Sequence, residues 1–264
     1  MKFYKAFTPF QKIFFVVFMI SSILTFFVPA FLNDWDFKTV LTVTGFIGLI
    51  ATVSGVITSI YQAKASLTVY FWWILNTLAM TLVSFIGGLY GEGLKNLFIL
   101  IPLEIYGFYM WKRSAEQSED GIVEARQFTP MQWVKTIIIM LVAWVLYGMF
   151  LKNIPSIMMN IFNVHIAADP SYIMDSLSSV ITTYALYLTS RRYVEQWYFW
   201  ILSNIGFIVF VETMVKQGFS INNLSGAMTW LQYGVSSFYG FYLWRRMYKE
   251  KHKGKDIEGN VLSA

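Results

Sequence analysis

The chain has 264 residues, of which 56% are hydrophobic and only 13% are charged, whereas a soluble domain carries roughly a quarter charged residues. Its lack of cysteine excludes disulfides, thiolate metal sites and a cysteine nucleophile. The net charge of +5 does not predict a nucleic-acid partner, because so apolar a chain belongs in a lipid bilayer, where the distribution of basic residues between loops matters more.

Eight apolar segments follow one another along the chain, each about as long as the 20 residues that cross a hydrocarbon core of about 30 Å. We predict an all-α integral membrane protein with eight transmembrane helices at residues 12–31, 40–62, 67–88, 94–111, 132–151, 171–190, 196–215 and 224–244. The first follows Lys2, Lys5 and Lys12, as a signal peptide would. Its apolar core is longer than that of a signal peptide and "VPAFLNDW" offers no small-x-small cleavage site, so we expect this helix to be retained.

Basic residues are strongly biased toward one side of this arrangement. Only four of the 20 Lys and Arg residues fall in the loops opposite the termini, namely Lys38, Lys95, Lys152 and Lys216. Because cytoplasmic loops are enriched in Lys and Arg, we predict that both termini lie in the cytoplasm. The tail "RRMYKEKHKGKD" then serves as a topology anchor, with binding of anionic lipid as the alternative.

Two pairs of similar segments indicate an internal repeat. "YFWWILN" at 70–76 resembles "YFWILSN" at 198–204, 128 positions later, and "IYGFYMWKR" at 105–113 resembles "FYGFYLWRR" at 238–246, 133 positions later. Each repeat contains three spans, and the single span between them returns the chain to the outside, so that both repeats cross the membrane in the same direction. We therefore predict a 3+1+3 parallel repeat preceded by an extra N-terminal helix.

This repeat divides the chain into five parts. We predict an N-terminal cytoplasmic segment with the extra membrane helix at 1–39, the first three-helix repeat at 40–111, the second repeat at 171–246 and a basic cytoplasmic tail at 247–264. Between the repeats, residues 112–170 hold a solvated cytoplasmic linker, the connector helix and an outer loop.

Four polar side chains are expected near the middle of the membrane. At 1.5 Å per residue, Asn76 and Asn204 lie about 12–15 Å inside the bilayer, and Glu104 and Gln232 lie about ten residues into spans that enter from the other side. An acid or amide that faces lipid is costly, so such residues normally face a cavity or a partner helix. We predict that all four contribute to a substrate-binding site, with hydrogen bonding between helices as the alternative for the two asparagines.

Tryptophans accompany these amides. Trp197, Trp200 and Asn204 are spaced i, i+3, i+7 and therefore share one helix face, and Trp72 and Asn76 repeat the last two. An aromatic wall that ends in an amide suits a flat, partly polar ring, whose faces stack on the indoles and whose edge bonds to the amide. The competing interpretation places Trp197, and less readily the deeper Trp72 and Trp200, in an aromatic belt at the membrane interface.

The blocks of glycine and aromatic residues that end each repeat have a structural interpretation. Trp111 and Trp244 precede basic residues and are expected to anchor their helices at the membrane interface. Gly107 and Gly240 are expected to permit close contact with a neighbouring helix.

The stretch "SRRYVEQWYFWILSN", with its Trp-x-x-Trp-x-x-x-Asn pattern, and the "YGFYxW" ending of each half resemble the PnuC vitamin transporters over roughly residues 45–246. The resemblance implies a fold like that of the SWEET sugar transporters, uptake of a small-molecule vitamin with nicotinamide riboside as the best-known substrate, and functional coupling to a cytosolic kinase. It places substrate binding on Trp197, Trp200 and Asn204. Val69 stands where the first half would match Trp197, and Leu186 stands near a position where the resemblance leads us to expect a polar residue.

Missing motifs bear on the energy source. The chain has no Gly-x-x-x-x-Gly-Lys-Ser/Thr phosphate loop, and beyond Glu104, Asp175 and Glu212 its spans hold few acids that would relay protons. We expect facilitated diffusion without a cofactor, with net uptake maintained by the phosphorylation that the resemblance implies. A phosphorylated substrate is disfavoured, because no Arg or Lys is expected at mid-depth to compensate its charge.

Other substrates and functions stay open as alternatives. Thiamine, riboflavin or a deoxynucleoside would also suit a PnuC-like transporter, and a membrane sensor is the alternative function. An enzyme is not expected, because His165 lies in an outer loop and His252 in the tail, away from any nucleophile or metal site within the membrane. A homo-oligomer is compatible with this plan, and no nucleic-acid partner is expected.

Overall fold

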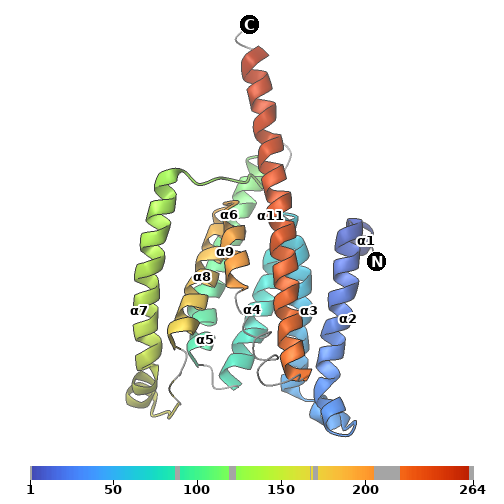
Figure 1. Ribbon diagram of the computed structural model, residues 1–264, viewed down its shortest axis with the longest axis vertical. Helices are drawn as coiled ribbons and strands as arrows, with labels where there is room; N and C mark the ends of the chain where they lie inside the picture. The colour runs from blue at the N-terminus through green and yellow to red at the C-terminus, as the bar shows by residue number, and fades with distance from the viewer. Residues whose placement is uncertain are drawn as a thin grey trace.

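The computed structural model describes residues 2–86, 90–118, 123–166, 168, 172–204 and 221–261. Within these ranges the chain is almost entirely helical, and its one isolated backbone bridge joins Arg126 to Tyr193. Figure 1 shows the helices side by side in a bundle, with α2 (Pro9–Leu32) at one side and α7 (Pro130–Phe162) at the opposite side.

A described helix lies in each of the eight predicted ranges; residues 87–88 of the third range, 171 of the sixth and 205–215 of the seventh lie outside the described part of the chain. Along the chain, α2 is followed by α3 (Val43–Ala63), α4 (Val69–Ile86), α5 (Tyr90–Lys95), the π-helical turn η2 (Asn96–Leu100), α6 (Ile101–Glu116) and then α7. After α7 come α8 (Tyr172–Ser190), α9 (Gln196–Ser203) and α11 (Ile221–Val261). Two further elements, α1 (Lys2–Lys5) and the 3₁₀ turn η1 (Phe37–Thr39), are short. Among the described residues, four helices, α2, α3, α4 and α7, are long and apolar enough to cross a membrane. The chain is therefore a multi-pass, all-α membrane protein.

The extra N-terminal helix α2 begins at a reciprocal cap. The Thr8 hydroxyl accepts a hydrogen bond from the Gln11 backbone N–H (3.3 Å), and the Gln11 side-chain oxygen accepts one from the Thr8 N–H (3.1 Å), which satisfies two otherwise unpaired donors. One stripe of the helix, including Phe14 and Phe18, is buried in a cluster with α3. Other apolar side chains of α2, among them Ile13, Ile20 and Leu24, are exposed, as expected for a helix that faces lipid.

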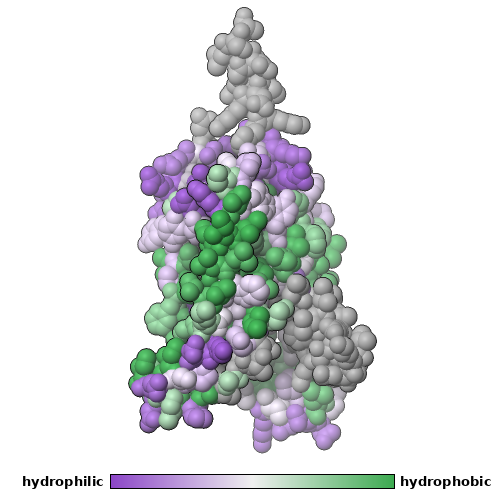
Figure 2. Space-filling model, turned by 60° about the vertical axis from the view of Figure 1, so that its left-hand side comes forward, coloured by the Kyte–Doolittle hydropathy of each residue, from purple (hydrophilic) through white to green (hydrophobic). Residues whose placement is uncertain are grey.

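The surface has the polarity pattern of a membrane protein. In Figure 2, hydrophobic side chains gather in a band at mid-height, and hydrophilic side chains gather toward the two ends of the visible face. The exposed face of α7 includes Ile137, Ile138, Leu141 and Val145. Exposed apolar area of this extent is uncommon on soluble monomers.

Basic residues mark one end of the bundle, at which α3, α6 and α8 finish. The loops here carry Lys64, Arg126, Arg191 and Arg192, and the last turn of α6 carries Arg113. Both α1 and the C-terminal part of α11 lie toward this end (Figure 1). We refer to it as the basic end.

The segment between α6 and α7 docks on the basic end, so the prediction of a wholly solvated linker is wrong. The Arg126 N–H donates to the Arg192 carbonyl (2.8 Å), and the Val194 N–H donates to the Arg126 carbonyl (2.8 Å). Val123 is 4% exposed and belongs to the largest hydrophobic cluster. Backbone pairing and one buried side chain therefore fix the end of the linker before α7 starts.

The ends of the helices correct the alignment of the two halves. The ends of α3 and α8, Ala63 and Ser190, are 127 positions apart, and so are the starts of α4 and α9. The left-handed residues that follow the first helix of each half, Ala65 (φ 53°) and Arg192 (φ 66°), share this spacing. The sequence alignment at 128 positions was therefore wrong by one residue, because the additional tryptophan in "YFWWILN" lets two registers match.

The corrected register aligns the aromatic residues of the two halves, whereas Asn76 now corresponds to Ser203 and Asn204 to Thr77. Trp73, and not Trp72, corresponds to Trp200, and Tyr70, and not Val69, corresponds to Trp197. The first half thus has an aromatic residue at both positions.

Close contacts at two glycines agree with this register. A Cβ atom on Gly107 would lie 2.5 Å from the Tyr70 hydroxyl, and one on Gly240 would overlap the ring of Trp197. The prediction that these glycines permit close helix contact is therefore confirmed. The neighbouring prediction for Trp111 and Trp244 is wrong, because both side chains are 0% exposed and so contact neither lipid nor solvent.

Candidate functional site

A cavity of about 770 Å³ lies among α3, α4, the α5–η2 segment, α7, α8, α9 and α11. Its volume falls in the range of roughly 300–1,000 Å³ that is usual for small-molecule sites. Hydroxyl side chains from both halves line it: Thr58, Ser59, Thr77, Ser178, Ser179, Thr182, Ser203, Ser236 and Ser237. Polar side chains at membrane depth normally face a water-filled space or a partner, so this cavity is the candidate site.

Two tryptophans form the aromatic wall of the cavity. Trp73 of α4 and Trp200 of α9 both line it, with ring centroids 5.8 Å apart and ring planes inclined by 42°. The Trp200 indole N–H donates to the Thr189 hydroxyl (3.1 Å), which holds this ring in place. Trp72 does not line the described cavity and instead contacts Phe71 edge-on at 5.2 Å, because successive residues of a helix point about 100° apart.

Trp197 has a different environment from the one predicted for it. Its side chain is 1% exposed and lies 6.2 Å from Trp244, between ring centroids. It is not among the described residues that line the cavity, and its burial also excludes a position in a lipid-facing aromatic belt. Trp197 therefore packs beyond the end of the cavity that lies toward the basic end.

The two predicted asparagines differ in position and in bonding, because Asn76 lines the cavity and Asn204 is not among its described lining residues. Asn76 lines it, and its side-chain N–H donates to the Ala51 carbonyl of α3 (2.5 Å), so the alternative of a bond between helices is also present. Asn204 donates to the carbonyl of Trp200 in its own helix (2.6 Å). Its side-chain oxygen is buried and has no hydrogen-bond donor within the described residues.

Glu104 lies directly behind the cavity wall. Its side chain is 0% exposed and accepts a hydrogen bond from the hydroxyl of Thr77, which itself lines the cavity (2.5 Å). The second carboxyl oxygen has no partner in the described part of the chain. Glu104 would therefore contact a ligand only if Thr77 moved aside. Otherwise its effect on the ligand would pass through the hydroxyl of Thr77.

Gln232 converges with Asn76 at a glycine of α3. A Cβ on Gly55 would lie 3.1 Å from the Tyr233 hydroxyl, 3.4 Å from the Asn76 side-chain nitrogen and 3.9 Å from the Gln232 side-chain nitrogen. Gly55 and Tyr233 line the cavity, whereas Gln232 is 5% exposed and lies behind them. The structure thus brings Asn76 and Gln232 together, as the sequence predicted for their depth.

The sequence interpretation missed Lys95, which it assigned to a loop. Lys95 lines the cavity and is 6% exposed; its ammonium lies 2.5 Å from a carboxyl oxygen of Glu92 and 3.2 Å from the hydroxyl of Ser179 in α8. The expectation that no Lys or Arg lies at mid-depth concerned Asn76 and Asn204, whereas Lys95 reaches the cavity from the end of α5. The i, i+3 spacing of Glu92 and Lys95 was the available signal, since such residues pair on one helix face.

Spanning helices that enclose a polar cavity, built from two similar halves, define this chain as a polytopic membrane transporter. The chain belongs to the nicotinamide mononucleotide transporter family, whose model matches residues 45–246. It is accordingly a transporter and not an enzyme.

Several relatives match over most of their length. The nicotinamide riboside transporter PnuC of Neisseria mucosa is 27% identical over 210 residues, which cover 78% of this chain and 74% of that protein. PnuC of Haemophilus influenzae is 24% identical over 250 residues, which cover 94% and 95%. The crystal structure of the vitamin B3 transporter PnuC is similar with a TM-score of 0.63 at 23% identity, over 93% of this chain and 94% of that chain, which shows a common fold.

Proposed function

We propose that this protein takes up nicotinamide riboside by facilitated diffusion across a bacterial inner membrane. The observation that carries the proposal is the pair of indoles, Trp73 and Trp200, that face one polar cavity 5.8 Å apart. A pyridinium ring is flat and positively charged, and the faces of tryptophan attract such a cation. The carboxamide of the same ligand matches the amide of Asn76, and its ribose hydroxyls match the hydroxyl side chains of the wall.

The remaining predicted site residues have supporting positions in this proposal. Asn204 follows Trp200 and has a buried oxygen without a donor among the described residues, which would accept from the ligand once the side chain turns toward the cavity. Glu104 lies behind the wall and fixes the hydroxyl of Thr77, which donates to it, and Gln232 lies behind Gly55, near Asn76. Trp197 supports the site from beyond its end, and Trp73 takes the role that the sequence gave to Trp72.

The charges of the cavity favour nicotinamide riboside over nicotinamide mononucleotide, although the family takes its name from the mononucleotide. Lys95 is the one cation among the described residues of the cavity wall, and Glu92 already pairs with it; Asp175 adds a second carboxylate to the same wall. A phosphate dianion would have to displace Glu92 from Lys95 and would meet the charge of Asp175. A substrate with a net positive charge meets no such opposition.

The architecture in this proposal is the 3+1+3 parallel repeat of a SWEET-like bundle. The first repeat comprises α3, α4 and the continuous α5–η2–α6 helix, α7 is the connector, and the second repeat comprises α8, the span that begins with α9, and α11. The basic end faces the cytoplasm, where a kinase phosphorylates the substrate and so maintains net uptake. The proposal does not require a homo-oligomer, because helices of one chain surround the cavity.

Two measurements test the proposal. Purified protein in sealed liposomes should equilibrate labelled nicotinamide riboside across the bilayer, whereas a sensor would bind the label without moving it. Calorimetry with nicotinamide riboside, its mononucleotide, thiamine, riboflavin and deoxynucleosides should give the tightest binding for the riboside. Tighter binding of the mononucleotide would refute both the choice of substrate and the argument from charge.

A further inference from the structure

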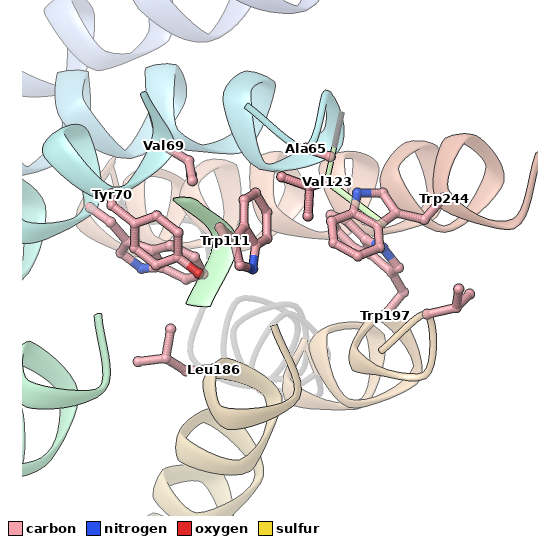
Figure 3. Close-up of a cluster of buried hydrophobic side chains, with 10 residues drawn as sticks. Ala65, Val69, Tyr70, Trp111, Val123, Leu186, Trp197 and Trp244 are labelled. Atoms are coloured by element: carbon pink, nitrogen blue, oxygen red, sulfur yellow. The ribbon is translucent and has the colours of Figure 1, made fainter. Parts of the chain in front are cut away.

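Three tryptophans fill the space between the cavity and the basic end, and we refer to Trp111, Trp197 and Trp244 as the tryptophan plug. Their exposed fractions are 0%, 1% and 0%. The ring centroid of Trp244 lies 5.5 Å from that of Trp111 and 6.2 Å from that of Trp197, and Figure 3 shows the three rings within one buried cluster. Gln62 and Leu186 line the cavity near this plug, which therefore separates the cavity from the basic end.

Two hydrogen bonds tie the plug to both halves in a reciprocal way. The Trp111 indole N–H, from the first half, donates to the carbonyl of Thr189 in α8 of the second half (2.7 Å). The Trp244 indole N–H, from the second half, donates to the carbonyl of Gln62 in α3 of the first half (3.1 Å). Thr189 and Gln62 are 127 positions apart, which is the spacing of the two halves, so the two bonds are equivalent.

Thr189 also connects the plug to the aromatic wall of the cavity. Its hydroxyl accepts a hydrogen bond from the Trp200 indole (3.1 Å) and has the Ala185 carbonyl (2.8 Å) and the Gln196 side-chain oxygen (2.5 Å) as acceptors for its own proton. The Gln62 side chain donates to the same oxygen of Gln196 (3.4 Å). A continuous set of hydrogen bonds thus runs from Trp200, in the cavity, to both residues whose carbonyls hold the plug.

The plug also contains a polar group that the closed packing leaves unpaired. The indole N–H of Trp197 is buried and has no acceptor among the described residues. An unpaired buried donor is costly, so the closed plug is less stable than its packing alone would make it. Rearrangement to a state in which this donor meets water or a carbonyl would recover that free energy.

From these contacts we propose that the tryptophan plug is the gate at the basic end of the transport cavity, and that Thr189 is the positioning residue that couples the gate to the ligand. The proposal rests on the transport function proposed above. Each tie joins the third helix of one half to the first helix of the other, so any relative displacement of the halves at this end stretches both ties together. A ligand that moves Trp200 changes the hydrogen bond from the Trp200 indole to the Thr189 hydroxyl. Because the Thr189 carbonyl holds Trp111, this change alters the stability of the closed gate.

The absence of cysteine from the chain allows a direct test with a single thiol. Ser59 lines the cavity and is 4% exposed, three residues before Gln62. In inside-out vesicles, a charged, membrane-impermeant methanethiosulfonate reagent should modify the Ser59→Cys protein slowly, because the closed plug blocks its path. Trp111→Phe or Trp244→Phe keeps an aromatic ring but removes one tie, and each should accelerate labelling about fivefold, the effect of one lost hydrogen bond.

Trp144→Phe is the matched control for loss of an indole N–H. Trp144 of α7 also donates to a backbone carbonyl, that of Ile173 (2.9 Å), but away from the plug, so this change should leave the labelling rate unaltered. Equal labelling rates in the parent, both plug variants and the control, with unchanged elution and thermal unfolding, would overturn the gate.

Thr189→Val tests the coupling, because it removes the hydroxyl and keeps the carbonyl that accepts from Trp111. In the parent, nicotinamide riboside should change the rate of Ser59→Cys labelling, and with Thr189→Val this dependence should be lost while binding of the riboside persists. Retention of the dependence would refute the coupling role. Failure of the riboside to bind the parent would instead refute the proposed substrate, while the comparison of plug variants without ligand would still decide the gate.

Discussion

Trp73 and Trp200, which occupy equivalent positions in the two halves of the chain, meet at the cavity with ring centroids 5.8 Å apart and planes inclined by 42°. The two rings are therefore in contact but tilted, and they do not stack face to face. Both carry a face toward the space in which a ligand would bind. The aromatic wall therefore consists of one tryptophan from each half of the chain. A site built from the second half alone would have only Trp200.

Removal of either ring should weaken binding. We expect Trp73→Ala and Trp200→Ala each to reduce the affinity for nicotinamide riboside by about 1–3 kcal/mol, by analogy with stacking of bases on aromatic side chains. Trp72→Ala is the matched control, because Trp72 lies outside the described lining of the cavity, and its affinity should stay close to that of the parent. Calorimetry on the three variants measures this, and an equal loss in Trp72→Ala would contradict the corrected register.

The contact between Gly240 and Trp197 should make the glycine intolerant of substitution. A methyl group on Gly240 would overlap the Trp197 ring, and such overpacking typically costs about 1–3 kcal/mol. Gly48→Ala provides the control, because no atom lies within 4 Å of the added Cβ and alanine favours helix by up to about 1 kcal/mol. Thermal unfolding in detergent should therefore fall for Gly240→Ala and stay level or rise for Gly48→Ala.

The two members of the Lys95–Glu92 pair should respond unequally to truncation. The Lys95 side chain is 5% exposed and that of Glu92 is 40% exposed. Glu92→Leu leaves a buried ammonium with Ser179 as a neutral partner and should destabilise the protein by about 1–3 kcal/mol. Lys95→Met leaves a carboxylate that water can reach and should cost less. Chemical denaturation of both single variants and the double variant gives the order, and a larger loss for Lys95→Met would show that Glu92 depends on the pair more than Lys95 does.

The buried contact between Thr77 and Glu104 makes another prediction about stability. Thr77→Val keeps the shape of the side chain but removes the donor to one carboxyl oxygen of Glu104, so that neither oxygen has a donor among the described residues. Loss of a hydrogen bond to a buried carboxyl group costs about 1–3 kcal/mol. Glu104→Gln retains an acceptor for Thr77 and should be the milder change. Thermal unfolding that is lower for Glu104→Gln than for Thr77→Val would argue against this account.

The distribution of basic residues predicts the orientation in the membrane. Tags fused to the N-terminus and to the C-terminus should be digested by protease only in inside-out vesicles, because loops rich in Lys and Arg stay in the cytoplasm. Protection of one tag and digestion of the other would mean that the number of spans is odd.

Periodicity and depth predicted much of the fold. Long apolar segments identified the helices, and the rise per residue placed Asn76 and Gln232 at one level, where the structure brings them together at Gly55. These inferences succeed because hydrocarbon thickness and helix geometry are fixed quantities. They need no knowledge of which helices are neighbours.

The errors arose where neighbours decide the outcome. A shift of one residue turns a helix by about 100°, so the duplicated tryptophan in "YFWWILN" was enough to select Trp72 in place of Trp73. Trp111 and Trp244 stand beside basic residues in sequence, but their indoles bond to carbonyls of helices in the opposite half. Lys95 was counted with a loop because the sequence does not show its neighbour in space. That neighbour is Ser179 of α8, which is 84 residues away along the chain.

The ion pair of Lys95 and Glu92 also has an electrical consequence. The two charges sum to zero, so this pair contributes no net charge that could offset that of a passenger. If the passenger bears a permanent pyridinium charge, each crossing carries current, and the membrane voltage does work on it of about 2.3 kcal/mol per 100 mV. That work corresponds to roughly a 50-fold concentration ratio at 100 mV. A cell with a negative interior would thus accumulate the passenger through a purely passive carrier, and a depolarised cell would lose this advantage.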